Sequence, residues 1–294
     1  CYSLTGNFHE VAYLANYFSL IEITSSFYRH LRPELSHLWV KKVANIPQFQ
    51  FTVKLHRIFT HKCILNRNDV HRFYKGLDPI YEAGRLGAVL MQFPRSFRAT
   101  KENHHYLLRL RKAFTKLPLV AELRHADWNQ DASLQWLTDN NIGFANIDQP
   151  QTPHSMPPTA HVTSSIGYFR LHGRNYQEWS THTTGSSVPY RLTTTQTRYN
   201  YLYSEEQLRS WHHRIATVSQ QTTKMFVVTN NHFQGHALVN ALQLSNMIFE
   251  KRVNVPPKLL ASYPELAHIT ENIPRQRSLF VFPTPKTQRH LLAS

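Results

Sequence analysis

The sequence predicts an α/β fold with a parallel sheet that closes into a barrel or stays open as a doubly wound sheet. Seven short runs rich in β-branched and aromatic residues alternate with longer segments of helical period, which is typical of βαβ units. Polar residues recur at the carboxyl ends of these runs. That recurrence favours a barrel with a polar mouth, because the active sites of barrel enzymes lie at that end.

The seven runs are short enough and apolar enough to be buried strands. The centres of these runs are apolar. Charged residues and histidines occur mainly near the carboxyl ends of the runs. In chain order the runs are Phe18–Thr24, Phe49–His56, Leu86–Phe93, Leu117–Arg124, Ile142–Asp148, Ile166–His172 and Lys224–Asn230.

Six segments between or after the runs predict helices, because their apolar residues recur three and four positions apart. In the fifth segment, Ser204 precedes Glu205 and Glu206, a combination that stabilises a helix N-terminus. The six segments are Arg32–Ala44, Asn68–Ala83, Lys101–Phe114, Ala132–Asn140, Ser204–Ser219 and Gln234–Phe249.

The chain is expected to comprise a barrel domain over residues 1–249 and a Pro-rich, basic appendage over residues 250–294. The appendage contains six prolines and shows no sustained periodicity. Within the barrel domain, the polar stretch Thr181–Thr197 predicts a long loop near the barrel mouth.

Composition predicts a basic protein of the cytoplasm. No apolar run reaches the roughly 18–20 residues of a membrane span, and no signal peptide is recognisable, so no membrane association is expected. The only cysteines, Cys1 and Cys63, cannot form a disulfide framework, which favours a reducing compartment. The oligomeric state is left open.

Positive charge is concentrated in the first part of the chain. The net charge is +15, and residues 1–120 contain 18 Lys and Arg against 7 Asp and Glu, whereas residues 121–249 contain 8 of each. A basic half of this kind is typical of proteins that bind nucleic acid or another polyanion, and equally of a solvated surface that only raises solubility.

Acidic residues and a histidine at the strand ends are the candidate catalytic groups. Glu22 and Glu122 lie on different predicted strands at the same end, where paired carboxylates can divide acid and base work. His172 is the candidate for proton transfer. Alternatively, the carboxylates only form ion pairs, Glu122 with Arg124 and Glu22 with Lys54.

Three cations at the same end, Lys54, Arg124 and Arg170, predict a substrate with a carboxylate or phosphate group. Other polar and aromatic residues of the strand ends and the segments after them are expected to orient that substrate or to wall the pocket. These candidates are His56, Gln92, Asp148, Asn230, Asn231, Tyr28 and Trp128.

No cofactor and no metal site are predicted. The sequence has no phosphate loop, no GxGxxG, no HExxH and no CxxC pair. A divalent metal nevertheless stays open, because His56, His61 and the strand-end carboxylates provide enough nitrogen and oxygen ligands.

Seven blocks of sequence follow one another along the chain, mostly at the predicted strand ends. They are Ile21-Glu22-Ile23-Thr24-Ser25-Ser26-Phe27-Tyr28, Phe51-Thr52-Val53-Lys54-Leu55-His56-Arg57, Leu90-Met91-Gln92-Phe93-Pro94, Ala121-Glu122-Leu123-Arg124-His125, Phe169-Arg170-Leu171-His172-Gly173-Arg174-Asn175, Tyr199-Asn200-Tyr201-Leu202-Tyr203 and Asn230-Asn231-His232. In their order and spacing these blocks resemble the YecE-like proteins, also known as domain of unknown function 72. That resemblance implies a TIM-type (β/α) barrel with a pocket at the strand ends, but no assigned activity. The family usually opens with a Gly-Thr-Ser-Gly-Trp strand, so this chain is expected to form a barrel lacking its first strand.

Three functional hypotheses follow from the sequence. The first is an enzyme, of the hydrolase, lyase or isomerase type, that acts on a polar or anionic small molecule by acid–base chemistry at the barrel mouth. The second is a non-catalytic protein that binds nucleic acid or another polyanion through the basic surface of residues 1–120. The third is a truncated, inactive copy of an active barrel.

Overall fold

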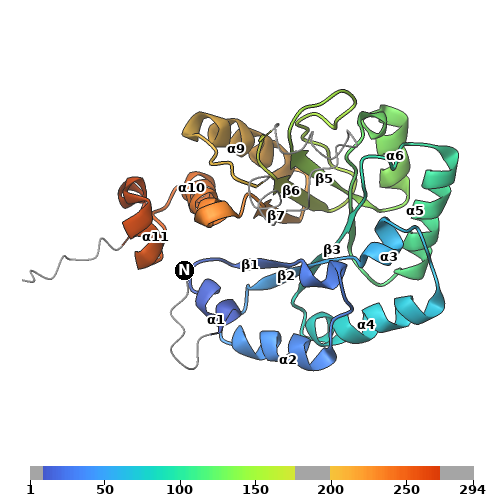
Figure 1. Ribbon diagram of the computed structural model, residues 1–294, viewed down its shortest axis with the longest axis horizontal. Coiled ribbons are helices and arrows are strands. Elements are labelled where there is room, and N and C mark those ends of the chain that lie inside the picture. Colours follow the sequence, from blue (N-terminus) through green and yellow to red (C-terminus); the bar gives the residue numbers. More distant parts are fainter. Residues whose placement is uncertain (1–8, 176–198, 272–294) are drawn as a thin grey trace, which may run out of the picture.

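Seven parallel strands form a nearly closed barrel in the computed structural model, which describes residues 9–175 and 199–271 (Figure 1). Each strand pairs with its neighbours in sequence, so the sheet order is β1 to β7. All seven predicted strands and the TIM-type α/β fold are thereby confirmed. The strands are β1 (Leu20–Ile23), β2 (Gln50–Lys54), β3 (Leu86–Gln92), β4 (Leu119–Glu122), β5 (Gly143–Asp148), β6 (Ile166–Leu171) and β7 (Lys224–Thr229).

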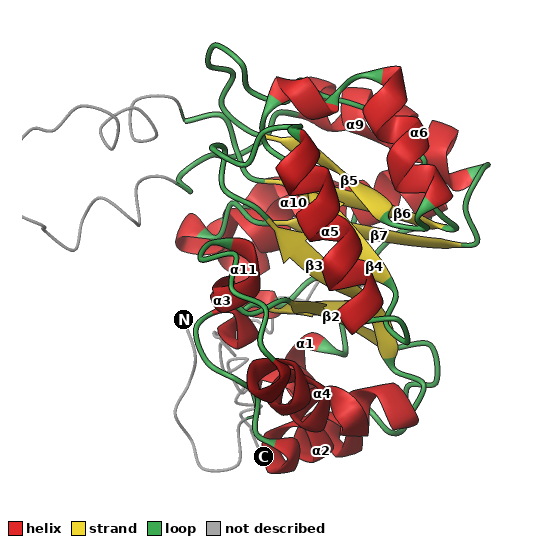
Figure 2. Cartoon of the chain, turned by 90° about the vertical axis from the view of Figure 1, so that its right-hand side faces the viewer, coloured by secondary structure: helices red, strands yellow, loops and turns green. Residues whose placement is uncertain are grey.

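Helices lie outside the strands, as Figure 2 shows for α4, α5, α6 and α9. The six predicted helices are confirmed, and Ser204 caps α9 in a capping box with Gln207. Three short helices, α1 (Glu10–Leu14), α3 (Arg57–Thr60) and α11 (Pro257–Ser262), were not predicted because each is too short to show a period. The six longer helices are α2 (Pro33–Lys42), α4 (Arg67–Glu82), α5 (Lys101–Ala113), α6 (Asp131–Asp139), α9 (Glu205–Ser219) and α10 (His236–Phe249).

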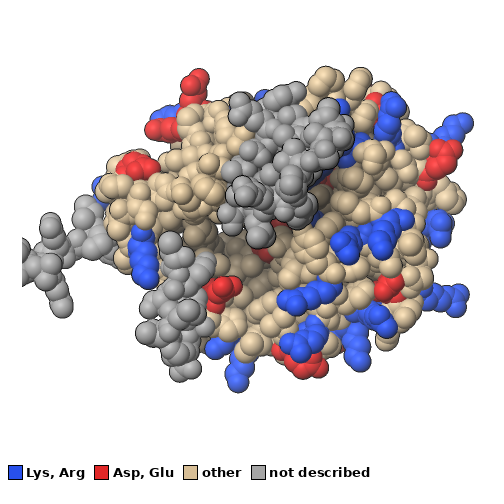
Figure 3. Space-filling model, in the orientation of Figure 1, with Lys and Arg blue, Asp and Glu red and all other residues tan. Residues whose placement is uncertain are grey.

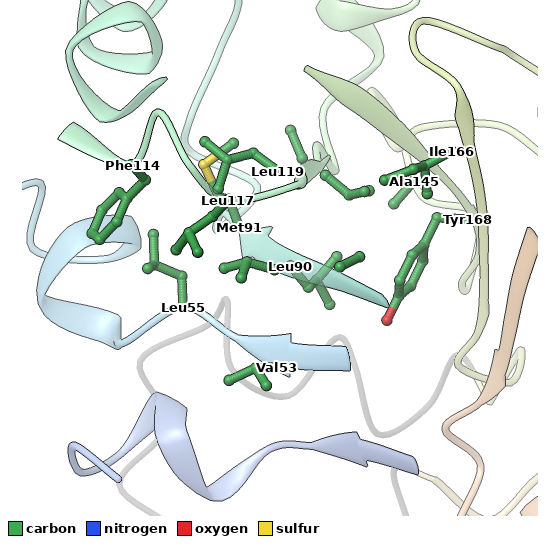
Figure 4. Packing of buried hydrophobic residues seen from close by; sticks show 14 of the residues in the cluster. Val53, Leu55, Leu90, Met91, Phe114, Leu117, Leu119, Ala145, Ile166 and Tyr168 are labelled. Carbon is green, nitrogen blue, oxygen red and sulfur yellow. The ribbon is translucent and has the colours of Figure 1, made fainter. Parts of the chain in front are cut away.

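On β2, alternation along the strand separates a hydrophobic core outside the sheet from polar side chains inside the barrel. On β2, Phe51 and Val53 are fully buried in the main hydrophobic cluster with helix residues such as Leu77 and Leu110. The alternate residue Thr52 instead accepts a hydrogen bond from the hydroxyl of Tyr168 on β6 across the barrel, at 3.1 Å. Figure 4 shows the packing of the core side chains around β2, β3 and β4.

The barrel is open along one seam, between β1 and β7. No backbone hydrogen bond joins these strands in the part of the chain that the structure describes. A groove of about 550 Å³ follows the seam. Its lining includes Leu20, Ile21 and Glu22 of β1, Val227 and Val228 of β7, and Leu238 of α10. Seven strands and an open seam agree with the expectation of a barrel that lacks one strand.

The first part of the expected appendage packs on the barrel. Residues 250–271 contain α11 and a short 3-10 helix at Pro264–His268. Val255, Leu266 and Ile269 form a small cluster with Val239 and Leu242 of α10. The domain boundary at residue 249 stays a prediction, and both the Thr181–Thr197 loop and residues 272–294 lie outside the described residues. No helix among the described residues is long and apolar enough to cross a membrane.

Candidate functional site

A cavity of about 550 Å³ lies at the carboxyl ends of the strands. Its volume suits a small molecule. Its walls come from the ends of β2, β3 and β6 and from the segments that follow all seven strands. Six of the predicted site residues line it, namely Tyr28, Lys54, Gln92, Arg124, Arg170 and Asn230.

Arg170 of β6 lines this cavity, and all three nitrogens of its guanidinium donate hydrogen bonds. Its Nε and Nη2 atoms donate to Glu22, with Nη2 2.6 Å from Oε1. Its Nη1 donates to Glu122 Oε2 at 2.9 Å and to Gln92 Oε1 at 3.2 Å. One buried cation thus joins carboxylates of β1 and β4, and Glu22 pairs with Arg170 and not with Lys54.

Glu122 is fully buried beneath the cavity and contacts three partners. Arg124 Nε donates to its Oε1 at 2.8 Å, Arg170 Nη1 donates to its Oε2, and His172 Nε2 lies 3.1 Å from Oε1. Burial by itself would raise the pKa of Glu122, but the Arg124 and Arg170 charges hold that pKa well below its ordinary value. The carboxylate therefore stays ionised at neutral pH.

His172 is also fully buried, between Glu122 and Asn230. The Nδ2 of Asn230 lies 3.1 Å from His172 Nδ1, which assigns Nδ1 as the acceptor and leaves the proton on Nε2, facing Glu122. Burial lowers the pKa of His172 to about 4, opposed by the Glu122 charge and assisted by Arg170 and Arg124. The imidazole is therefore neutral at neutral pH and donates to Glu122.

Lys54 ends β2 and is only 9% exposed. Its Nζ lies 4.1 Å from the centroid of the Phe27 ring, a cation–π distance. Burial and the neighbouring charge of Arg170 lower the pKa of Lys54 to about 7, against the opposing effect of Glu122 and Glu22.

Seven of the predicted site residues do not line the cavity. Glu22, Glu122 and His172 converge directly beneath it, and whether they act as acid and base stays a prediction. The other four lie apart from it. His56 caps α3 and stacks on His30, and Trp128 is buried and donates to the carbonyl of Phe97.

Asp148 and Asn231 do not line the cavity but form hydrogen bonds with the elements around it. The Asp148 carboxylate accepts hydrogen bonds from Arg174 Nε and from Trp211 Nε1 of α9. Asn231 is buried and donates to the carbonyl of Tyr201 and to Asn240 Oδ1 of α10. Asp148 thereby binds Arg174, which follows β6, to α9, and Asn231 binds Tyr201 to α10.

Several residues of the cavity wall are not among the site residues that the sequence predicts. His61, which the sequence suggests only as a metal ligand, lines the wall, and burial together with the Lys54 and Arg124 charges lowers its pKa to about 4. Four others lie in the segments that follow β3 and β5, and their position after a strand end is the sequence signal that could have indicated them. They are Arg95, Gln149, Thr152 and Ser155.

The described residues contain no group of three or more His, Cys, Asp or Glu side chains placed to hold a metal ion. The sites of His56, Asp148 and Glu122 are separate, with each side chain bonded to its own protein partners. Binding of a divalent metal stays the untested alternative that the sequence suggests.

Comparisons with known proteins agree with the resemblance noted in the sequence. UPF0759 protein YunF from Bacillus subtilis (strain 168) is 25% identical over 261 residues, which cover 84% of this chain and 89% of YunF. The crystal structure of a DUF72 family protein from Enterococcus faecalis V583 matches with a TM-score of 0.72 and 26% identity, over 85% of this chain and 91% of that one. A DUF72 family protein from Thermotoga maritima MSB8 matches with a TM-score of 0.68 and 28% identity, over 83% and 92% of the two chains. Since the profile of the family described as protein of unknown function DUF72 matches residues 3–264, this chain belongs to the DUF72 family.

Proposed function

We propose that this protein is an enzyme that binds a small molecule through an anionic group at the barrel mouth and converts it by acid–base chemistry. The observation that carries this proposal is the charge of the cavity wall. Four cationic side chains line it, and its described lining includes no Asp or Glu. The four are Lys54, Arg95, Arg124 and Arg170.

The two nearby carboxylates do not cancel this wall. Glu22 and Glu122 lie behind it, are nearly or fully inaccessible, and are bonded to Arg170 and Arg124. They hold the guanidiniums in place and keep them charged, so the surface that a ligand meets is positive. Arginine also presents a planar fork that matches carboxylate and phosphate.

Acid–base chemistry is supported by the presence of polar groups with displaced pKa values beside the same cavity. Lys54 and His61 line the wall, and His172 lies one hydrogen bond behind Asn230, which lines it too. In this proposal the neutral His172 is the group that accepts and returns a proton, the ionised Glu122 holds and orients the imidazole, and Tyr28 and Gln92 orient the substrate.

Replacement of Arg124 by glutamine is expected to weaken the binding of inorganic phosphate or a small dicarboxylate roughly tenfold or more, the value of a charge-assisted hydrogen bond. Isothermal calorimetry at pH 7 measures this loss. Arg98→Gln is the matched control, because Arg98 is exposed and paired with Asp127 outside the cavity wall. If the two variants bind the anion with equal affinity, Arg124 does not contribute to the anion site.

A second candidate function, polyanion binding, has one observation in its favour. Figure 3 shows the Lys and Arg side chains of one face gathered over the half of the molecule where Figure 1 places α2 to α5. The double substitution Lys41→Glu and Lys42→Glu on α2 should then lower the salt concentration that elutes the protein from a heparin column, whereas Arg124→Gln should not. If the double variant elutes at the same salt concentration as the wild type, α2 is not part of a polyanion-binding surface.

A further inference from the structure

Lys54 differs from the other cations of the cavity in having no bonded partner. Arg124 and Arg170 donate to Glu122 and Glu22, and Arg95 donates to Thr152 at 2.6 Å. The Nζ of Lys54, by contrast, forms no hydrogen bond or ion pair with any residue that the structure describes, and its close neighbour is the Phe27 ring. A lysine that is largely buried and still lines a cavity is placed to meet a ligand.

The charges around Lys54 explain why it lacks a counter-ion. Glu22 from β1 and Glu122 from β4 face it, but Arg170 from β6 and Arg124 after β4 neutralise those two carboxylates. His61 after α3 is the remaining titratable neighbour. A third cation in this group is therefore in surplus, and burial together with Arg170 brings the pKa of Lys54 to about 7. A much larger share of this amine than of an ordinary lysine is then neutral at pH 7, and a neutral amine is a nucleophile.

We propose that Lys54 forms an imine with the carbonyl carbon of an anionic aldehyde or ketone whose anionic group is held by Arg124. This inference rests on the proposed function, since the same cavity and the same arginine provide the anion site. It narrows the substrate from any anionic small molecule to an oxo acid or a phosphorylated carbonyl compound.

The chemistry balances without a further reactant. The lone pair on Nζ forms a C–N bond to the carbonyl carbon, and one Nζ proton passes to the carbonyl oxygen. The C–O bond of this carbinolamine then breaks, and the oxygen takes up a proton from solvent and leaves as water. The product is a protonated imine, whose positive charge lies where the lysine ammonium lay, facing Glu22 and Glu122.

Reductive trapping tests this proposal on the intact protein. Glyoxylate, an anionic aldehyde, is added at pH 7 with sodium cyanoborohydride, and peptide mass spectrometry follows the modification of each lysine. Lys54 should be modified at least about tenfold faster than the exposed lysines Lys75 and Lys101, because the ordinary lysine pKa near 10.4 leaves very little free amine at this pH. Glycolaldehyde, which is neutral, is the matched reagent, and it should label Lys54 more slowly than glyoxylate does.

The outcomes separate the imine from the anion site. Arg124→Gln should slow the labelling of Lys54 by glyoxylate more than its labelling by glycolaldehyde, because both reagents are affected by the loss of a charge that lowers the pKa of Lys54, but only glyoxylate also loses its anion partner. Labelling of Lys54 no faster than that of Lys101 with both reagents overturns the imine, and phosphate binding measured by calorimetry then shows whether the proposed function survives. Fast labelling of Lys54 that is equal for both reagents and independent of Arg124 keeps the nucleophile and overturns the anionic substrate class.

Discussion

Replacement of Glu122 by glutamine is expected to lower the free energy of unfolding at pH 7 by about 3 to 5 kcal/mol. The change keeps the shape of the side chain but removes the charge that pairs with Arg124 and with Arg170, so Glu22 is left as the carboxylate partner of Arg170. The cost arises mainly from the positive charge that this leaves incompletely compensated in a medium of low polarity. Urea unfolding followed by circular dichroism measures the loss.

The matched control for this experiment is Glu205→Gln on α9. Glu205 pairs with Arg209, but both side chains are more than half exposed. A pair of this kind contributes about 0.2 to 1 kcal/mol, so the control should unfold close to the wild type. A Glu122→Gln protein as stable as the control would show that the ion pairs of Glu122 with Arg124 and Arg170 do not stabilise the barrel.

The stability of the protein is expected to fall between pH 6.5 and pH 4 because of His172. Its pKa in the folded state is about 4, so the unfolded chain takes up a proton on this residue at a higher pH than the folded chain does. A histidine pKa that folding lowers gives stability that is complete above pH 6.5 and is lost as the pH falls towards 4. The contribution of His172 to this loss is about 3 kcal/mol over the whole window.

His172→Gln isolates this effect from the other histidines, because glutamine cannot titrate. The variant is expected to be less stable at pH 7.5, where it loses the hydrogen bonds to Glu122 and Asn230, but its stability should fall less steeply below pH 6.5. Urea midpoints at four pH values between 4.5 and 7.5 give the two slopes. Parallel pH curves for variant and wild type would contradict the assignment of a neutral, buried imidazole.

The fold could be predicted because the strand pattern is local. In β2 the alternation of Thr52 and Lys54 with Phe51 and Val53 states directly which residues share a face. Alternation does not state which of the two faces looks inward, and this is where Asp148 departs from the prediction. It shares the polar alternation of the other strand ends, yet its carboxylate bonds Trp211 of α9.

The cavity wall was harder to predict for a different reason. Arg95 and Ser155 lie on irregular segments, where the position of a side chain depends on loop conformation and not on a sequence period. The pairing of Glu22 with Arg170 crosses 148 residues of sequence, and nothing local distinguishes it from the pairing with Lys54 that the sequence suggested. Long-range ion pairs of this kind become visible only when the strands are assembled.

The open seam has a consequence for how the barrel assembles. Every backbone ladder joins strands that are consecutive in sequence, so the sheet can grow one short connection at a time, without an early closure over the length of the chain. Within the described residues, the first strand meets β6 through the bonds from the Tyr168 hydroxyl and the Arg170 guanidinium to Glu22. We therefore expect these side-chain bonds to be the last step of folding and the first to break when the protein unfolds.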